Sequence, residues 1–351
     1  MKYGRHFAIV AVLIVIGSIV AYVLLESIYA LPLAASEEAD GIDALFRGHF
    51  ILISFLFALV VVFLLYSVVV FRRRPDEPED VEGDHFHGHT GLEIVWTIIP
   101  LMLVVVFGVW GARLLTDIIA PDEDEITINV VGQQWSWRFE YPEHGDITSD
   151  ELVLPVHQPV RLEMTSIDVL HSFWVPEFRV KQDLVPGQIH ELRITPTDEG
   201  DYKTRCAEIC GTSHAYMISD VRVVSEDDFE AWVEESSTSI AELEPVERGL
   251  TWSQQFGCTG CHSPDGTALA GPTWQGLFGS EVQLASGETV LVDEEYIRNS
   301  LLMPNDQLHA GFGPNIMPQN FEELFAEEEA KYDGEVSIID DLIVYIQSLS
   351  E

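Results

Sequence analysis

Long apolar runs dominate the first third of the chain. They lie at Phe7–Leu25, Phe50–Phe71 and Leu92–Ile119, and each approaches or exceeds the ~20 apolar residues that cross a bilayer as a helix. A helix buried in a soluble protein rarely stays apolar on every face for so long. We therefore predict a membrane-anchored, multidomain protein with a transmembrane helical hairpin over residues 49–120.

The first apolar run has two interpretations. It follows Lys2 and Arg5 and precedes small residues such as Ala34 and Ala35, a pattern typical of a cleavable signal peptide. An extra membrane helix that stays in the mature protein would carry the same apolar run. The sequence leaves residues 1–35 open between these two interpretations.

Basic residues indicate the orientation in the membrane. Lys2 and Arg5 precede the first run and Arg72–Arg74 follow the second, whereas the segment between these runs is acidic. Because loops rich in Lys and Arg stay in the cytoplasm, everything after Ile119 is expected outside. We predict a multi-pass protein of the cell (plasma) membrane, embedded in lipid, with its later domains on the outer, periplasmic side.

Short apolar or alternating runs follow the membrane segments. Pro, Gly and Asp separate these runs, which lie at Ile126–Val131, Glu151–Pro155, Val160–Thr165 and Gln188–Thr195. This texture is typical of strands in a β-sandwich. We predict one sandwich domain over residues 121–235, closed by a short helix at Glu226–Glu235.

The amino-acid composition changes after residue 235. Residues 236–249 contain Ser, Thr, Glu and Pro with little apolar content, which favours a linker. Residues 250–351 begin with a Cys-rich segment, continue through Gly/Pro-rich loops and end in an amphipathic pattern near Ser337–Leu349. We predict a separate C-terminal domain there.

The net charge limits the partners of the protein. It is −40, from 58 acidic and 18 basic residues, and only four of the basic residues are lysines. So negative a chain repels nucleic acid, which excludes that class of partner. An acidic surface is compatible with a salt-loving source or with docking of a basic electron-carrier protein, and also with simple solubility.

The second cysteine cluster is typical of covalent haem attachment. In Cys258-Thr-Gly-Cys261-His262 two thiols are spaced to reach both vinyl groups of a haem, and the adjacent His262 can bind the iron. A methionine on the other face would raise the haem potential. We favour Met317, in the loop Gly313-Pro-Asn-Ile-Met-Pro318, over Met303 at the end of a predicted helix. A disulfide between the two cysteines is the alternative.

The first cysteine cluster favours a copper site. In Cys206-Ala-Glu208-Ile-Cys210-Gly-Thr-Ser-His214-Ala-Tyr-Met217 two thiolates on one loop can bridge two copper ions. Soft sulfur combined with imidazole is the ligand set of copper electron-transfer sites. A structural zinc site or a disulfide is the alternative. The expected copper ligands are His171, Cys206, the carbonyl of Glu208, Cys210, His214 and Met217.

With both motifs in place, the chain resembles subunit II of cytochrome c oxidase in its caa-type form, which has a fused cytochrome c domain. Three other segments carry the resemblance: Leu92-Glu93-Ile-Val-Trp-Thr-Ile-Ile-Pro100, Gln133-Gln-Trp135-Ser-Trp137-Arg-Phe-Glu-Tyr141 and Asp168-Val-Leu-His171-Ser-Phe-Trp-Val-Pro176. The resemblance implies a cupredoxin-like sandwich with a dinuclear copper A centre, followed by an all-α class I cytochrome c domain.

The resemblance also implies roles for single residues. Trp135 matches the tryptophan through which electrons enter, and Glu93 matches a carboxylate at the mouth of a proton channel in subunit I. The carboxylate of Glu208 matches a ligand of a Mg²⁺ ion shared with subunit I. The residues alone leave other interpretations open. Trp135 fits one buried strand face with Trp137, Glu93 fits a favourable charge at a helix start, and His85-Phe-His87-Gly-His89 fits a solvated loop better than a metal site.

The implied function is electron entry into a respiratory haem–copper oxidase. An external donor, cytochrome c or a quinol:donor complex, would reduce the haem, and copper would pass electrons to subunit I and its partner subunits, which reduce oxygen and pump protons. Three alternatives explain fewer residues. A quinol-oxidase subunit lacks the copper ligands, a membrane copper chaperone needs neither Met217 nor a haem motif, and a nitrous oxide reductase needs a second, His-rich domain.

Overall fold

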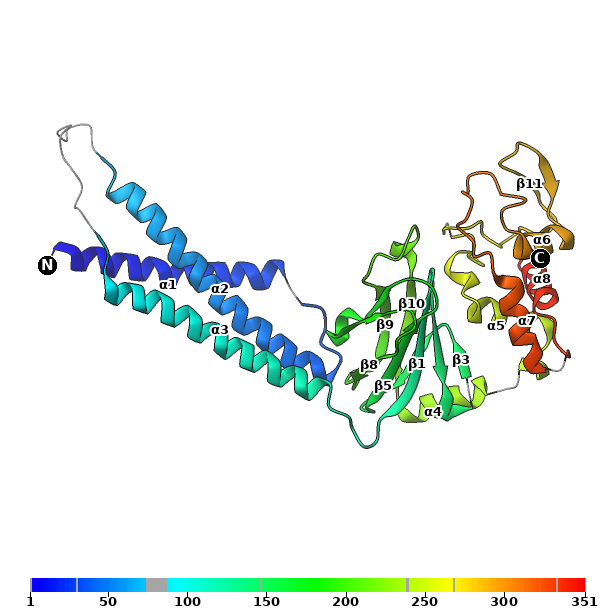
Figure 1. The fold of residues 1–351 in the computed structure, drawn as a ribbon, viewed down its shortest axis with the longest axis horizontal. Coiled ribbons are helices and arrows are strands. Elements are labelled where there is room, and N and C mark those ends of the chain that lie inside the picture. The colour runs from blue at the N-terminus through cyan, green and yellow to red at the C-terminus, as the bar shows by residue number, and fades with distance from the viewer. Residues whose placement is uncertain are drawn as a thin grey trace. The chain divides into compact units, whose positions relative to one another are not determined.

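The computed structural model describes residues 2–29, 31–73, 87–145, 147–237, 240–267, 269–332 and 334–350. These residues form two compact units. The first contains long helices, and the second contains a β-sandwich followed by a mainly helical domain (Figure 1). The apolar helices and the later domains thus belong to different units.

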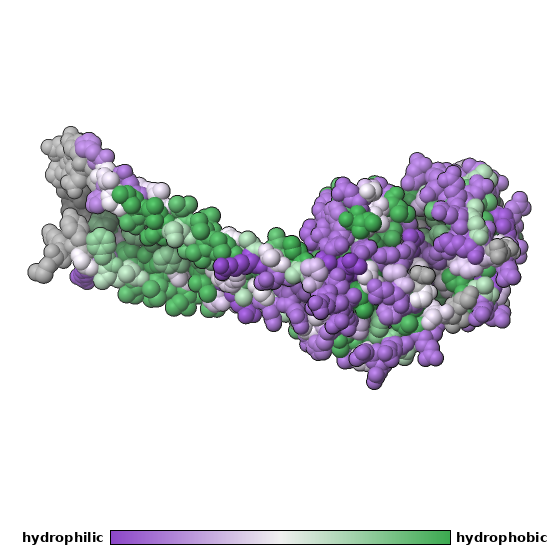
Figure 2. Space-filling model, turned by 60° about the horizontal axis from the view of Figure 1, so that its bottom comes forward, coloured by the Kyte–Doolittle hydropathy of each residue, from purple (hydrophilic) through white to green (hydrophobic). Residues whose placement is uncertain are grey.

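Three long helices form the first unit: α1 (Lys2–Ile28), α2 (Glu37–Val70) and α3 (Thr90–Ile118). All three are long and apolar enough to cross a membrane, and Figure 2 shows their surface covered by apolar residues. Small residues lie where the helices meet. A Cβ atom added to Gly17 would lie 3.2 Å from Cβ of Ala58, and one added to Gly48 would lie 3.1 Å from the Trp110 ring. Such close approaches are typical of helices packed in a bilayer.

The second membrane helix begins earlier than predicted. We expected the hairpin to start near residue 49, where the apolar run begins, but α2 already starts at Glu37. Its first residues, Glu37 and Glu38, carry negative charge at the helix N-terminus, where the backbone dipole favours it. The polar first part of α2 therefore escapes a search for apolar runs.

Two five-stranded sheets form the sandwich (Figure 1). One sheet has the order β3-β2-β1-β5-β8 and the other β4-β10-β9-β6-β7. The parallel neighbours are β1 with β5 and β10 with β4. The strands are β1 (Ile126–Gln133), β2 (Ser136–Tyr141), β3 (Ile147–Ser149), β4 (Leu152–Pro155), β5 (Val160–Ser166), β6 (His171–Trp174), β7 (Lys181–Leu184), β8 (His190–Ile194), β9 (Gly200–Cys206) and β10 (Ile218–Val224).

Alternating side chains build the core of the sandwich, as the sequence predicts. Every second residue of β5 is buried, and Leu162 and Met164 are fully enclosed. On β2 the buried side chains are Trp137, Phe139 and Tyr141. A period of two places one set of side chains between the sheets and the other set toward solvent. Helix α4 (Glu226–Ser236) follows the last strand, close to its predicted position.

The C-terminal domain packs its helices around one apolar cluster. Its helices are α5 (Pro245–Gln255), α6 (Glu294–Leu302), α7 (Phe321–Glu329) and α8 (Ile338–Ser348). The buried cluster includes Trp252, Phe325 and Leu342. A Cβ atom on Gly249 would lie 2.2 Å from the carbonyl oxygen of Asp341, so only glycine allows α5 to approach α8 this closely.

Two predictions for this region need correction. The expected linker, 236–249, is helical from Pro245, because Glu244 and Glu247 cap the first turn of α5 and Arg248 pairs with Asp341 on α8. The domain is also not entirely α-helical. A hairpin of β11 (Glu281–Gln283) and β12 (Thr289–Leu291) lies before α6, and Gly287 supplies the positive φ of its turn.

Candidate metal centre

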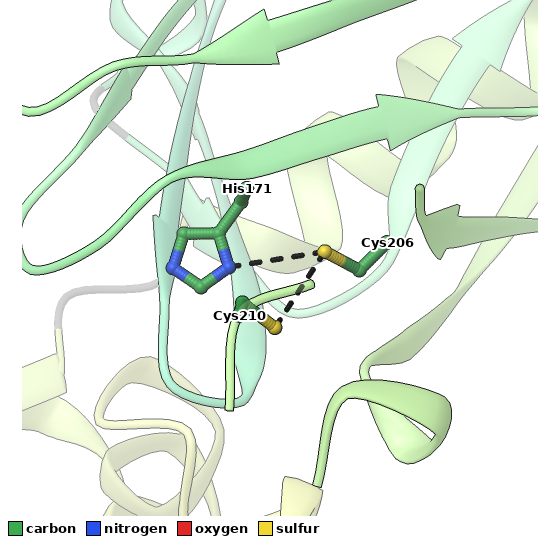
Figure 3. A group of neighbouring side chains, drawn as sticks. All are labelled: His171, Cys206 and Cys210. Atoms are coloured by element: carbon green, nitrogen blue, oxygen red, sulfur yellow. Dashed lines mark hydrogen bonds between the residues drawn. The ribbon is translucent and has the colours of Figure 1, made fainter. Parts of the chain in front are cut away.

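Two cysteines and one histidine converge at one end of the sandwich (Figure 3). Cys206 ends β9, Cys210 lies in the loop that follows, and His171 begins β6; all three are buried. The two Sγ atoms are 3.7 Å apart, and Nδ1 of His171 is 3.9 Å from Sγ of Cys206. Pairing between β6 and β9 places Phe173 opposite Cys206 and so brings the distant His171 beside the cysteine loop.

The other three predicted ligands surround the same sulfurs. Sγ of Cys210 lies 3.5 Å from Nδ1 of His214 and 3.8 Å from Sδ of Met217. The carbonyl oxygen of Glu208 lies 3.2 Å from Sγ of Cys206. The two imidazoles therefore lie beside different sulfurs, His171 at Cys206 and His214 at Cys210. His171, Cys206 and Cys210 lie close enough together to hold a metal ion.

The electrostatics of the pair favour one thiolate. Burial opposes ionisation of Cys206, but hydrogen bonds with His171 and with the backbone of Glu208 and Ser172 lower its pKa. Burial raises the pKa of Cys210, and the charge of Cys206 raises it further. A bound metal cation would remove the second proton, since thiolate is the binding form. The buried set of sulfur and imidazole, without a carboxylate among the closest donors, fits a soft metal such as copper, and also zinc.

The turn between β1 and β2 holds the cysteine loop in place. Nε2 of Gln134 and Nε1 of Trp135 both donate to the carbonyl oxygen of Cys210, at 2.7 and 3.3 Å. Trp135 is only 6% exposed, yet it lies in this turn and not on a strand. The buried strand face predicted for the aromatic segment therefore holds Trp137, Phe139 and Tyr141. Trp135 does not belong to it.

Asp168 connects this turn to His171, the predicted metal ligand. Its Oδ1 lies 2.8 Å from Nε2 of His171, and its Oδ2 accepts a hydrogen bond of 2.6 Å from the backbone N–H of Gln134. A carboxylate behind a ligating imidazole is a common way to orient the ring. No sequence pattern assigned this role to Asp168 or to Gln134. The only sequence signal was an aspartate three residues before the predicted ligand His171.

Two further side chains enclose the imidazole of His171. The ring of Trp137 meets it edge-on, with centroids 6.1 Å apart. A Cβ atom on Gly132 would lie 3.2 Å from the His171 ring, so glycine leaves the room that the ring occupies. Packing thus orients His171 before any metal binds.

A cavity of about 560 Å³ lies beside the Cys258 motif. Cys258, Cys261 and His262 line it, and so does Met317. Its size falls in the range of small-molecule and cofactor sites. Both cysteines are free thiols, so a disulfide between them is not formed. Volume and lining fit a haem attached to this motif.

His262 is oriented for metal binding through one nitrogen. Its Nδ1 lies 2.8 Å from the carbonyl oxygen of Pro272, and its ring stacks on Trp274 at an interplanar angle of 9°. If Nδ1 carries the proton and donates it to Pro272, Nε2 keeps a lone pair for a metal. Burial lowers the pKa of His262, which favours the neutral, metal-binding form.

The two candidate methionine ligands differ in position. Met317 lines the cavity and packs against the apolar cluster of the C-terminal domain. Met303 caps the end of α6 and is 51% exposed. Of the two methionines, Met317 therefore lines the cavity, and Met303 does not.

The remaining predicted residues have local partners. Glu93 lies in the first turn of α3, where its carboxylate accepts a hydrogen bond from the backbone N–H of His89. His89 caps the same helix by accepting from the N–H of Leu92. His85 lies outside the described residues. The side chain of Glu208 is exposed.

Two family models match this chain. Residues 25–114 match the model described as "Cytochrome C oxidase subunit II, transmembrane domain", and residues 146–224 match "Cytochrome C oxidase subunit II, periplasmic domain". The second match contains all six predicted copper ligands. Both matches end before the Cys258 motif.

Curated relatives carry the same description. The chain is 35% identical over 235 residues to cytochrome c oxidase subunit 2 of Alkalihalophilus pseudofirmus. This match covers 64% of this chain and 68% of that protein. It is 31% identical over 251 residues to cytochrome c oxidase subunit 2 of Cereibacter sphaeroides. This match covers 61% of this chain and 82% of that protein. The apolar helices, the sandwich and these relatives agree, and the chain belongs to the cytochrome c oxidase subunit II family, with a cupredoxin-like β-sandwich behind its apolar helices.

Proposed function

We propose that this chain is the electron-entry subunit of a respiratory haem–copper oxidase. As a member of its family, it is a subunit of a cytochrome c oxidase complex. In the proposed function, a c-type haem in the C-terminal domain takes electrons from an external donor, and a dinuclear copper centre relays them to the oxygen-reducing, proton-pumping subunit I. The chain's own residues bind, orient and shield these two groups.

One observation carries the copper assignment. Two buried sulfurs lie 3.7 Å apart, and each has its own imidazole, with Met217 and a backbone carbonyl nearby. A tetrahedral zinc site needs only the two cysteines and two histidines. The thioether of Met217, which is fully buried against Cys210, fits a weak ligand of copper. His171 and His214 would each hold one copper ion.

Cys258, Cys261, His262 and Met317 would hold the haem. The thiols of Cys258 and Cys261 would attach it, and Nε2 of His262 and the thioether of Met317 would bind the iron from opposite sides. Burial raises the pKa of Cys258 to about 12 and that of Cys261 to about 11, so both thiols stay protonated until the attachment reaction. The domain would act as a tethered donor, which gives it a high effective concentration at the copper domain.

Other residues have proposed roles at the borders of the subunit. Trp135 would carry electron entry at the copper site, because its indole bonds directly to the carbonyl of Cys210. The exposed carboxylate of Glu208 would bind Mg²⁺ shared with subunit I, and Glu93 would lie at the mouth of a proton channel. The basic residues near α1 and α2 favour a periplasmic location for both cofactor domains.

The test is spectroscopy of the full chain in detergent, loaded with copper and haem. We expect near-infrared absorption, a mixed-valence copper signal in electron paramagnetic resonance, and a low-spin c haem. Cys206→Ser should abolish the mixed-valence signal and leave the haem spectrum unchanged. Ser286→Ala, which changes an exposed residue between β11 and β12, is the control and should leave both spectra unchanged. A fully metallated chain that holds a single zinc ion or a cystine at Cys206 and Cys210 would overturn the proposal.

A further inference from the structure

The haem-attachment turn, residues Gly257–Cys261, touches the sandwich directly. A Cβ atom on Gly260 would lie 2.9 Å from the carbonyl oxygen of Trp135. A Cβ atom on Gly257 would lie 2.0 Å from Oγ of Ser136 and 2.7 Å from Nε2 of Gln133. At Gly260 the obstacle is backbone, so a larger residue there would force the turns apart. At Gly257 the nearest atoms are ends of side chains, and its positive φ also favours glycine. The attachment turn therefore meets the turn between β1 and β2 through glycines, with no side chain of its own at these two positions.

Thr259, which lies between these two glycines in the sequence, makes a polar contact with the sandwich. The side chain of Thr259 lies beside the carboxylate of Asp150, between β3 and β4, and acts to lower its pKa. The attachment turn thus has two faces. Gly257, Thr259 and Gly260 contact the sandwich, whereas Cys258 and Cys261 line the haem cavity.

The haem cavity also continues onto the sandwich. Besides the motif residues, it is lined by Gln134, Trp135 and Asp168, the residues that hold the copper-binding loop and its histidine. The turn that carries Trp135 is therefore at once the contact surface of the attachment turn and part of the cavity wall. Any change that separates the two turns would open this wall.

We infer that Gly260 and Thr259 are positioning residues, which dock the haem-attachment turn onto the Gln133–Ser136 turn and keep the cavity closed against Trp135. This inference rests on the proposed function only for its consequence, which is fast electron transfer between the two domains. Gly260 does so by having no side chain, and Thr259 by its hydroxyl. The partner of the Trp135 turn is thus a segment of the same chain.

Gly260→Ala is the most direct test. Gly260 does not have a positive φ, so alanine fits its own backbone, and only the Trp135 turn across the interface obstructs it. In the full chain in detergent, we expect hydrogen–deuterium exchange of the Gln133–Ser136 amides to accelerate about tenfold or more, as a local opening requires. Flash-initiated electron transfer from haem to copper should slow by a similar factor, with the haem spectrum unchanged.

Thr259 provides an independent pair of variants. Thr259→Val removes the hydroxyl and keeps the shape, and we expect the same two effects in weaker form. Thr259→Ser keeps the hydroxyl and should restore wild-type behaviour, which a merely structural role in the haem domain would not require. Thr289→Val makes the same replacement at an exposed residue of β12 in the same domain, so it is the matched control. If Gly260→Ala fails to fold, the Thr259 pair decides the question.

Two outcomes contradict the inference. Exchange at Gln133–Ser136 that stays at the wild-type rate in both Gly260→Ala and Thr259→Val would show that the turns do not dock. Faster exchange in Thr289→Val as well would show that the effect is not specific to the contact. The exchange measurement needs no cofactor, so failure of the proposed function, seen as absence of bound haem or copper, is distinguishable from failure of the docking contact.

Discussion

Asp168 lies behind His171, with its Oδ1 2.8 Å from Nε2 of the imidazole. Its other oxygen accepts from the backbone of Gln134, next to Trp135. One carboxylate thus orients a proposed copper ligand and fixes the turn that carries the proposed electron-entry residue. Burial opposes ionisation of Asp168, but hydrogen bonds with His171 and with backbone N–H groups outweigh it and lower its pKa, so the carboxylate is charged at neutral pH.

Asp168→Asn is expected to raise the midpoint potential of the bound copper by tens of millivolts. A negative charge beside the metal stabilises its oxidised form, and the amide removes that charge while it keeps the shape. A redox titration followed by near-infrared absorption measures the shift. Asp201→Asn, which changes an exposed carboxylate on the same domain, should leave the potential in place. An unchanged potential in Asp168→Asn would refute the role of this charge.

The two methionines are expected to differ in their effect on the haem. Met317→Leu should convert the haem from low spin to high spin, because the residue lining the cavity loses its thioether. Met303→Leu should leave the spectrum unchanged, because this side chain points largely into solvent. Optical spectra of the reduced and oxidised chain separate the two cases. A high-spin haem in Met303→Leu would reverse the ligand assignment.

Neighbouring aspartates on α8 are expected to differ in their contribution to stability. Asp341 is buried, with hydrogen bonds of 2.8 and 2.7 Å from Arg248 and one of 3.1 Å from Trp252. Asp341→Ala should lower the free energy of unfolding of the C-terminal domain by about 3–5 kcal/mol, because it leaves the arginine without its charge partner. Denaturant titration followed by haem absorption gives this value.

Asp340 is the matched control for that measurement. It pairs with Arg298, but its side chain is 60% exposed. Because solvent screens such a pair, Asp340→Ala should change the free energy of unfolding by less than about 1 kcal/mol. Equal losses in the two variants would contradict the assignment of stability to the buried network.

Docking of the attachment turn is expected to weaken as the pH rises. Burial raises the pKa of Asp150, and the charge of Asp220 acts in the same direction, while its own backbone and the side chain of Thr259 act to lower it. Tyr345 of α8 faces the same carboxylate. A raised pKa means that protonated Asp150 favours the docked state, which is therefore strongest below the ordinary aspartate pKa of about 4 and is lost as the pH rises through the raised value.

Oxidative footprinting of Trp135 across this pH range measures the effect. Exposure of the indole should increase with pH in the wild-type chain and increase less in Asp150→Asn, which removes the titrating carboxyl at this contact. Asp122→Asn, which changes an exposed carboxylate before β1, should follow the wild type. A pH profile in Asp150→Asn identical to that of the wild type would show that this carboxyl does not control docking.

Each of the four apolar or alternating runs in the sequence coincides with a strand of the sandwich, namely β1, β4, β5 and β8. The run Val160–Thr165 and strand β5 differ by one residue at the end, because alternation reports directly which side chains face the core. The linker prediction was wrong at Pro245–Gly249 for a non-local reason. Its polar residues indicate a mobile segment when they are considered alone, but Arg248 finds its partner Asp341 on a helix at the far end of the chain.

Trp135 illustrates the same limit at the site. Its spacing with Trp137 and Phe139 fits a strand face, and the sequence alone could not separate that packing role from a role in a turn. The chain reverses between β1 and β2, so Trp135 leaves the sheet and contacts Cys210 instead. Only the pairing of the two strands decides this.

The sequence by itself predicted most donors of the two proposed sites, because Cys206 to Met217 and Cys258 to His262 each lie within a single loop or turn. Tertiary structure decided everything that depends on distant segments. The tertiary structure places the carboxylate of Asp168 behind His171. It also places Met317, and not Met303, at the cavity, and Gly260 against Trp135. The donors within one short peptide can be predicted from their spacing, whereas the distant donors His171 and Met317, and the orientation of every donor, follow from strand pairing and domain packing.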